Sequence, residues 1–279
     1  MKKSNALSFL CCTLVCLLIL SACSSGKEIN GKIAMEITTS DGRSIDAFFY
    51  PAAKPDAPVV ILAHWARSGQ EVWEQVAYWL QNRGFAGTSE SENNSDPWLD
   101  STWFPEMPAD RTYNVLTFSC DGCGEAGCRT NLGRDKWVLD MQAAFEVART
   151  LESVDPARVV GIGASIGADG VVGECLYLNS KYLGTCRGAL SLSPGNYLPL
   201  DYYSNVKDLL AMDPSVPVQC FYSSEDRASE FVCQVVQDIE NVTVVEYQGS
   251  NHGMELIQPG LEHNALTIVL QFLSDTLGG

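Results

Sequence analysis

Basic side chains are scarce in this sequence, and their scarcity disfavours two kinds of partner. The chain of 279 residues has 18 lysines and arginines against 34 aspartates and glutamates, a formal net charge of −16. Nonspecific nucleic-acid binding needs a basic surface that neutralises phosphates, so we predict no nucleic-acid partner. Electrostatic docking on anionic lipid is disfavoured for the same reason. The hydrophobic fraction of 46% and charged fraction of 19% are those of a packed globular protein.

A hydrophobic run of full transmembrane length is also missing. The longest run, Ala6–Leu20, is shorter than the ~20 apolar residues that a membrane-spanning helix needs, and Lys2 and Lys3 precede it. This order of charged and apolar residues is typical of an export signal. The sequence therefore predicts an exported protein.

The apolar run ends in Leu20-Ser21-Ala22-Cys23, which resembles the lipobox of bacterial lipoproteins. The resemblance implies that residues 1–22 are a signal peptide, that Cys23 is lipidated, and that residues 23–32 form the lipidated cysteine and its tether. The protein would then be an exported lipoprotein, anchored to a cell-envelope membrane through its N-terminal lipid. The alternative is an ordinary signal peptide that contains cysteine, or an uncleaved anchor.

Cysteine, by contrast, is plentiful, with 11 residues. Four belong to the predicted leader and lipid site, which leaves seven, and export permits disulfides among them. Because seven is odd, at least one thiol is unpaired or pairs between molecules. Local spacing predicts the disulfides Cys175–Cys186 and Cys220–Cys233.

The other three cysteines are Cys120, Cys123 and Cys128, and they fit either a metal site or a disulfide. A structural zinc site usually has four ligands, and no histidine lies near these cysteines in the sequence. We therefore favour a disulfide and predict neither a metal nor a cofactor.

Short apolar runs alternate with segments of helical periodicity along the chain. Strands are predicted at 33–38, 44–50, 59–63, 113–118, 158–162, 187–192, 216–222 and 242–247. Helices are predicted at 71–81, where Gly84 is expected as the C-cap, at 136–151, from the glycine-rich turn to about 178, at 230–239 and at 265–277. This alternation predicts an α/β fold with a mostly parallel central sheet and helices on both faces. Residues 33–279 are expected to form one domain, in which ligands bind at the carboxyl ends of the strands.

A nucleophile motif follows the 158–162 strand. The segment Gly163-Ala164-Ser165-Ile166-Gly167 has the pattern G-x-S-x-G between a strand and a helix. Small residues around Ser165 suit a tight turn that lifts the serine hydroxyl above the sheet. The alternative is a glycine-rich packing turn without a chemical role.

A serine hydroxyl needs a base, and the chain has only three histidines. His252 follows the last strand and is predicted to be the base. His263 begins the closing helix and is expected at the surface, whereas His64 is expected to shape the loop after the 59–63 strand. The acid that orients the base should follow the 216–222 strand, where Glu225 and Asp226 both qualify.

Four segments together resemble the α/β-hydrolase superfamily, in its dienelactone-hydrolase-like and serine-esterase branches. They are 59–65, 155–167, 217–226 and 249–253, and the resemblance extends over about residues 33–277. It implies an α/β-hydrolase fold with the catalytic order Ser165, Asp226, His252. Asp226 is selected over Glu225 because family members have a small residue three positions before the acid, here Ser223.

The resemblance also implies an oxyanion hole made by the backbone N–H groups of Ile166 and Ala66. Family members often have His-Gly-X where this chain has His64-Trp65-Ala66. The implied activity is that of a serine hydrolase, carboxylesterase-like, which cleaves a small-molecule ester or related acyl bond through an acyl-enzyme. A serine peptidase or acyltransferase would use the same triad, and a non-catalytic binding lipoprotein would keep the same fold.

Two loops depart from the family pattern. Residues 86–112 form a long acidic connection with three aromatic residues, which is either a solvated surface insertion or a small lid over the pocket. Residues 119–128 replace a common Asp-x-Arg-Gly-x-Gly segment at the expected edge of the site. A disulfide within 119–128 would stiffen one wall of the pocket.

Overall fold

The computed structural model describes residues 28–88, 96–129 and 133–278. The predicted signal peptide and Cys23 lie outside the described residues, as do the first part of the tether and residues 89–95 of the long connection. Among the helices that are described, none is both long and apolar enough to cross a membrane.

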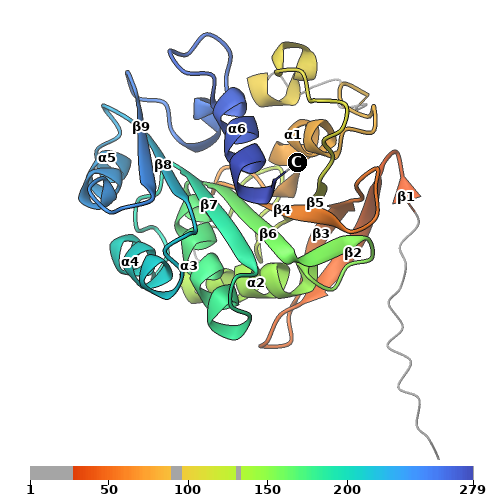
Figure 1. Cartoon of the computed structure of the whole chain (residues 1–279), viewed down its shortest axis with the longest axis horizontal. Coiled ribbons are helices and arrows are strands. Elements are labelled where there is room, and N and C mark those ends of the chain that lie inside the picture. Colours follow the sequence, from red (N-terminus) through yellow and green to blue (C-terminus); the bar gives the residue numbers. More distant parts are fainter. Residues whose placement is uncertain (1–27, 89–95, 130–132, 279) are drawn as a thin grey trace, which may run out of the picture.

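The described chain is built around one nine-stranded sheet (Figure 1). Its strands are β1 (Glu28–Ile29), β2 (Lys32–Thr38), β3 (Ser44–Tyr50), β4 (Ala57–Ala63), β5 (Asn114–Phe118), β6 (Val154–Ala164), β7 (Cys186–Leu192), β8 (Val218–Ser223) and β9 (Val242–Tyr247). Their order across the sheet is β1-β2-β3-β5-β4-β6-β7-β8-β9. Neighbours from β1 to β5 run antiparallel and neighbours from β5 to β9 run parallel, so the predicted mostly parallel sheet is confirmed.

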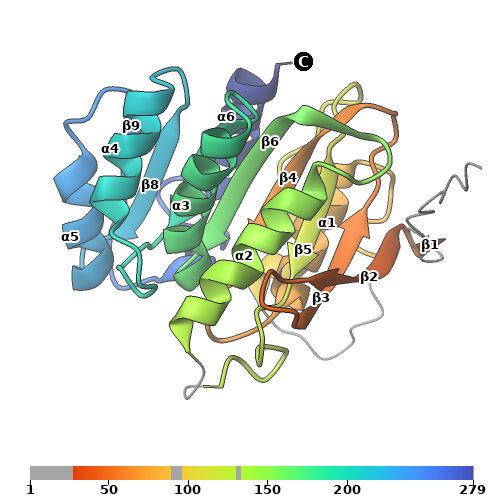
Figure 2. The ribbon, with the colours of Figure 1, turned by 90° about the horizontal axis from the view of Figure 1, so that it is seen from below.

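Helices cover both faces of this sheet, as predicted (Figures 1 and 2). They are α1 (Glu74–Gln81), α2 (Arg134–Ala148), α3 (Ile166–Lys181), α4 (Tyr202–Met212), α5 (Arg227–Val236) and α6 (Ala265–Leu277). One hydrophobic core lies under α1 and α6, and a second lies under α2 to α5. Strand β4 is buried at every position because both cores contact it. Parallel strands that are covered on both faces read as continuous apolar runs for this reason.

Two details of the helices differ from the prediction. Helix α1 ends at Gln81, and its C-cap is Asn82 in the left-handed conformation with φ 52°, so the prediction of Gly84 as the cap is wrong. Asparagine tolerates this conformation better than most residues with a side chain. Helix α4 was not predicted, although Asp201 caps it and its buried residues Tyr202, Val206 and Leu209 have helical spacing.

The aromatic residues of the 86–112 connection pack against the domain. Trp98, in the short 3-10 turn Pro97–Leu99, is 4% exposed and meets the ring of Trp65 edge-on, with centroids 5.5 Å apart. Phe104, which follows a second 3-10 turn at Ser101–Trp103, packs against Trp79 of α1. The described part of this connection is therefore anchored by its aromatic side chains, and its role as a lid stays a prediction.

Candidate active site

Ser165 occupies a strained turn between β6 and α3. Strand β6 ends at Ala164 and α3 begins at Ile166, so Ser165 alone reverses the chain, with φ 55° and ψ −113°. A Cβ on Gly163 would lie 2.2 Å from the carbonyl oxygen of Gly167, and a Cβ on Gly167 would lie 2.4 Å from that of Ala63. Only glycine fits at either position, and this tight geometry is that of a nucleophile elbow.

Three predicted side chains meet at the carboxyl edge of the sheet. The Oγ of Ser165 lies 2.8 Å from Nε2 of His252, and Nδ1 of His252 lies 2.6 Å from Oδ2 of Asp226. These residues follow β6, β9 and β8 in turn. With the proton of the ring on Nδ1, His252 donates to Asp226 and accepts from the serine hydroxyl. Glu225, the alternative acid, is exposed.

Asp226 is held in place by the helix that it caps. It is the N-cap of α5, and its Oδ2 accepts the hydroxyl proton of Ser229 at 2.7 Å as well as the bond from His252. Burial favours the neutral carboxyl, but the hydrogen bonds from His252 and Ser229 outweigh burial and lower the pKa of Asp226 below its usual value. The carboxylate therefore stays ionised and orients the imidazole.

The backbone around His252 is fixed by two buried or partly buried acceptors. Its own N–H donates to Oε2 of Glu255 at 2.9 Å, and the N–H of Gly253 donates to the hydroxyl of Ser193 at 3.0 Å. The other oxygen of Glu255 forms an ion pair with Arg67 at 2.8 Å. Glu255 thus joins the loop that carries His252 to the loop after β4.

Asp169, which the sequence analysis missed, fixes a third loop. Its carboxylate accepts from four successive backbone N–H groups, those of residues 195–198, including Gly195 at 2.8 Å and Leu198 at 3.1 Å. Burial raises the pKa of Asp169 to about 6 against the opposing effect of these donors. The loop so held places the ring of Tyr197 edge-on to His252, with centroids 5.9 Å apart. The sequence offered one signal of this role, because Asp169 is an acid among apolar residues in the helix that follows the G-x-S-x-G motif.

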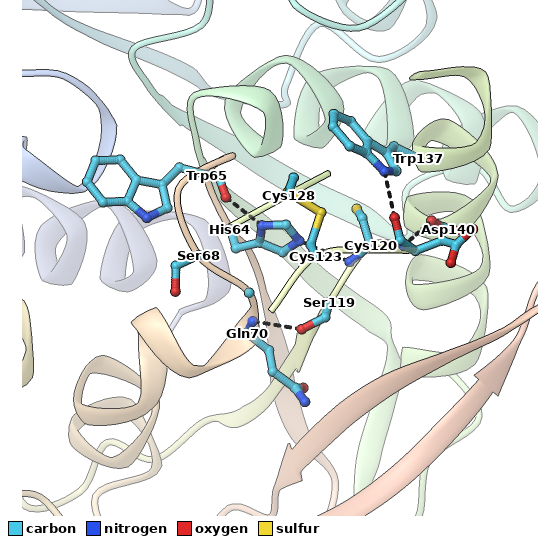
Figure 3. The surroundings of a disulfide bond; sticks show 12 residues. His64, Trp65, Ser68, Gln70, Ser119, Cys120, Cys123, Cys128, Trp137 and Asp140 are labelled. Carbon is cyan, nitrogen blue, oxygen red and sulfur yellow. Dashed lines mark hydrogen bonds between the residues drawn. A yellow bond between two sulfur atoms is a disulfide. The ribbon is translucent and has the colours of Figure 1, made fainter. Parts of the chain in front are cut away.

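His64 has the structural role that the sequence predicted. Its ring is fully buried, Nδ1 donates to the carbonyl of Trp65 at 2.7 Å, and Nε2 accepts from the N–H of Cys120 at 3.0 Å (Figure 3). Burial lowers the pKa of His64, so the ring is neutral. The imidazole connects the loop after β4 to the loop after β5.

The loop after β5 packs directly against the predicted oxyanion loop. The N–H of Cys128 donates to the carbonyl of Ala66 at 2.8 Å, and a Cβ on Gly127 would lie 3.1 Å from the same oxygen. A disulfide joins Cys128 to Cys123 within this loop (Figure 3). Ala66 and Ile166, the two predicted oxyanion donors, line one cavity together with Ser165.

The other cysteines follow the predicted pairing. Disulfides join Cys175 to Cys186 and Cys220 to Cys233. Cys120 carries the unpaired thiol and is buried, which raises its pKa well above the usual value. The buried thiol is therefore held in the neutral form.

A histidine does lie near the cysteine cluster in the folded chain, although none is close in the sequence, so the expectation of no nearby histidine is wrong. Because β4 and β5 are adjacent, a ring nitrogen of His64 comes within 4.8 Å of the sulfurs of Cys123 and Cys128. Both sulfurs are joined to each other, and both nitrogens of His64 are hydrogen-bonded. These groups therefore do not fit a metal ion while the disulfide is formed.

The cavity at Ser165 has a volume of about 380 Å³. Its walls are mainly apolar and aromatic, with two arginines among the lining residues. The lining residues are Trp65, Ala66, Arg67, Cys128, Arg134, Trp137, Ser165, Ile166, Tyr197 and His252. The serine hydroxyl therefore borders a mainly apolar cavity.

The sheet topology and the elbow define an α/β-hydrolase fold, and solved structures agree. An esterase of Pyrococcus furiosus matches with a TM-score of 0.56 and 18% identity, over 88% of this chain and 93% of that chain. A thermostable carboxylesterase from a metagenomic library matches with a TM-score of 0.58 and 13% identity, over 91% of each chain. Dienelactone hydrolase of Anabaena variabilis matches with a TM-score of 0.56 and 12% identity, over 88% of this chain and 95% of that chain. At these identities the likeness establishes the fold.

Sequence comparison adds distant relatives. No protein-family model matches the chain. The uncharacterized protein YfhR of Salmonella typhimurium is 25% identical over 215 residues, which cover 69% of this chain and 64% of that protein. YfhR of Escherichia coli K12 is 24% identical over 205 residues, which cover 69% of this chain and 62% of that protein. The chain thus spans less than two thirds of the length of these relatives.

Proposed function

We propose that the protein is a serine hydrolase that cleaves a carboxylic ester or a related acyl bond. The observation that carries the proposal is the chain of hydrogen bonds from Ser165 through His252 to Asp226, with distances of 2.8 and 2.6 Å. The strained turn at Ser165 and the adjoining cavity of about 380 Å³ support it. The fold that the chain shares with esterases is a further support.

The reaction follows from these positions. His252 removes the hydroxyl proton as Ser165 Oγ attacks the acyl carbon, and Asp226 stabilises the imidazolium that forms. His252 then gives the proton to the leaving oxygen, and the acyl group remains on Ser165. A water molecule, activated by His252 in the same way, releases the acid and restores the serine. Each proton transfer uses groups of this chain.

Backbone donors stabilise the tetrahedral intermediate. Ile166 begins α3, so its N–H has no acceptor within the helix and is available to an oxyanion. Ala66 supplies the second N–H from the loop that Cys128 and the disulfide support. The positive end of the α3 dipole favours the same negative charge. Loss of one such donor typically costs about 3 kcal/mol in transition-state stabilisation.

Labelling with a fluorophosphonate probe tests the nucleophile. We expect covalent modification of the purified protein, located at Ser165 by mass spectrometry, and no labelling of Ser165→Ala. Ser180→Ala is the matched control, because Ser180 is an exposed serine of the same helix. Labelling that persists in Ser165→Ala would contradict the assignment. A series of matched ester and amide substrates then separates an esterase from a peptidase.

We also propose that the protein is exported and held at a membrane by lipid on Cys23. The support is the leader sequence, with its basic start, apolar run and Leu20-Ser21-Ala22-Cys23. Expression with a radioactive fatty acid should label the protein, and Cys23→Ala should remove the label. Mass spectrometry of an unmodified Cys23 in the mature protein would refute lipidation.

A further inference from the structure

Tyr197 packs against the base of the candidate triad, and the reaction proposed above gives it no role. Its ring meets the imidazole of His252 edge-on, with the centroids 5.9 Å apart and the planes at 81°. Burial raises the pKa of Tyr197 and the nearby charge of Asp226 adds to this effect, so the phenol is neutral and lies beside the acid as well as the base. The same side chain lines the cavity at Ser165. The ring is therefore placed to limit the movement of the imidazole.

We propose that Tyr197 is a positioning residue for His252, and that Asp169 holds Tyr197 in place through the backbone of residues 195–198. The inference rests on the proposed serine hydrolase function and adds to it a means of keeping the base in its reactive orientation. Neither side chain takes part in a proton transfer. Asp169 acts on the reaction through Tyr197, and Tyr197 acts through His252.

The two hydrogen bonds of His252 leave one movement of its ring unopposed. Nδ1 binds Asp226 and Nε2 binds the hydroxyl of Ser165. Hydrogen bonds to ring nitrogens lie near the plane of the ring, so they resist a tilt out of that plane only weakly. A second ring packed at 81° to the imidazole opposes such a tilt. Small tilts matter, because a misplacement of about 1 Å can lower a rate by about 100-fold.

Asp169 gives the loop that carries Tyr197 a fixed conformation. It is 1% exposed, and its two carboxylate oxygens accept from the four successive N–H groups of residues 195–198. The pKa of about 6 leaves this carboxylate mainly ionised at neutral pH. An asparagine amide has only one oxygen, and its NH2 group cannot accept from an N–H. Asp169→Asn should therefore release part of the loop without changing the size of the side chain.

Two further contacts orient Tyr197 within this loop. Its carbonyl oxygen accepts from Nη1 of Arg134 at 2.6 Å. A Cβ built on Gly195 would lie 2.3 Å from Cζ of the Tyr197 ring, so the ring packs directly on this glycine. Gly195→Ala must displace the ring, although alanine keeps the N–H that bonds to Asp169. This substitution therefore moves Tyr197 and leaves the buried carboxylate in place.

Kinetics per active site test the proposal. A fluorophosphonate, allowed to react to completion, counts the sites at which Ser165 is functional, and kcat for p-nitrophenyl acetate is then expressed per site. Loss of folded protein lowers the number of sites, whereas a displaced imidazole lowers kcat per site. We expect Tyr197→Leu, Gly195→Ala and Asp169→Asn each to lower kcat per site by about 10-fold. In Asp169→Asn, KM should change by less than about 3-fold, and Tyr197→Phe, which keeps the ring, should recover most of the loss seen in Tyr197→Leu.

Glu174→Gln is the matched control, because it exchanges another buried acid of α3 for its amide. It should leave kcat per site within about 2-fold of the wild-type value. The double variant Asp169→Asn/Tyr197→Leu tests whether the two residues act in series. We expect its loss to be close to that of either single variant, about 10-fold, because independent effects would multiply to about 100-fold.

The outcomes separate this inference from the proposed function. If Ser165 is labelled but Tyr197→Leu and Gly195→Ala keep the wild-type kcat per site, the inference is overturned and the hydrolase proposal stands. Equal losses in Asp169→Asn and Glu174→Gln, or multiplied losses in the double variant, also overturn it. Absence of labelling at Ser165 in the unaltered protein removes both. If Asp169→Asn fails to fold, Gly195→Ala and Tyr197→Leu still decide the inference, since both keep the buried carboxylate.

Discussion

The two walls of the candidate active site are held together by different means. Ser165, Asp226 and His252 lie on one wall, in the turns and loops that follow parallel strands β6, β8 and β9. Asp226 caps a helix, and His252 begins a capping box with Glu255. The positions of the three side chains on this wall are therefore set mainly by the sheet.

The opposite wall consists of the loops after β4 and β5, which are held by contacts between distant residues. His64 bridges them, the N–H of Cys128 supports the carbonyl of Ala66, and the Cys123–Cys128 disulfide closes the second loop. The comparison teaches that the proposed catalytic residues are positioned by the sheet, whereas the predicted oxyanion loop is positioned by cross-links between loops. Substitutions in the two walls should therefore act on different properties of the protein.

The largest effect is expected from Asp226→Asn in the sheet-borne wall. Asparagine still caps α5, so the fold should persist, but a neutral amide no longer selects the productive ring tautomer of His252. We expect kcat for an ester to fall by about 10⁴-fold with little change in the thermal midpoint. Glu225→Gln, the neighbouring exposed acid, should leave kcat within about 2-fold. Similar losses in both variants would contradict the role of Asp226.

Glycine substitutions compare the rigidity of the walls. A Cβ on Gly163 meets the Gly167 carbonyl oxygen at 2.2 Å, while a Cβ on Gly124, in the loop after β5, meets nothing within 4 Å. Gly163→Ala should lower the free energy of unfolding by about 3 kcal/mol, because backbone must move. Gly124→Ala should change it by less than about 0.5 kcal/mol. Urea unfolding of both variants measures the difference, and equal stabilities would show that the elbow has room to relax.

Disulfide removal separates activity from stability. Replacing Cys123 and Cys128 by serine should cost about 2 kcal/mol, because the closed loop is short, and should lower kcat/KM by about 10-fold as the support of Ala66 loosens. The disulfide between Cys175 and Cys186 closes a loop that does not support Ala66. Replacing these two cysteines by serine should therefore lower the free energy of unfolding by about 3 kcal/mol and leave kcat/KM nearly unchanged. Ester kinetics and denaturant titrations on both variants provide the test. A larger loss of activity in the second pair would refute a special role for the first.

The same contrast between the two walls explains which parts of the candidate active site can be predicted from the sequence. The order Ser165, Asp226, His252 is readable because each residue follows a predicted strand, and parallel strands bring their carboxyl ends to one edge. The contacts of the other wall are not readable, since the meeting of His64 with Cys120 and of Trp65 with Trp98 depends on the packing of loops far apart in sequence. Which of three cysteines stays unpaired is settled by the same packing.

Asp169 illustrates the limit from within the predictable wall. It lies four positions after Ser165, in a helix whose presence was predicted, yet its four backbone partners come from the loop after β7. No local pattern marks residues 195–198 as donors to a distant carboxylate. Buried polar groups find partners wherever the fold brings them, and the partners are a tertiary property.

A last prediction concerns Glu174, a second buried acid of α3. Burial raises its pKa well above the usual value, and the nearby charge of Glu146 acts in the same direction. The folded protein therefore keeps a proton that the unfolded chain releases above about pH 4.5, so stability should decline as pH rises from that value. Glu174→Gln carries no such proton and should flatten the decline. Urea titrations from pH 5 to 8 measure the two slopes, with Glu152→Gln, an exposed acid, as the control. Equal slopes for the wild type and Glu174→Gln over this range would show that Glu174 is ionised in the fold.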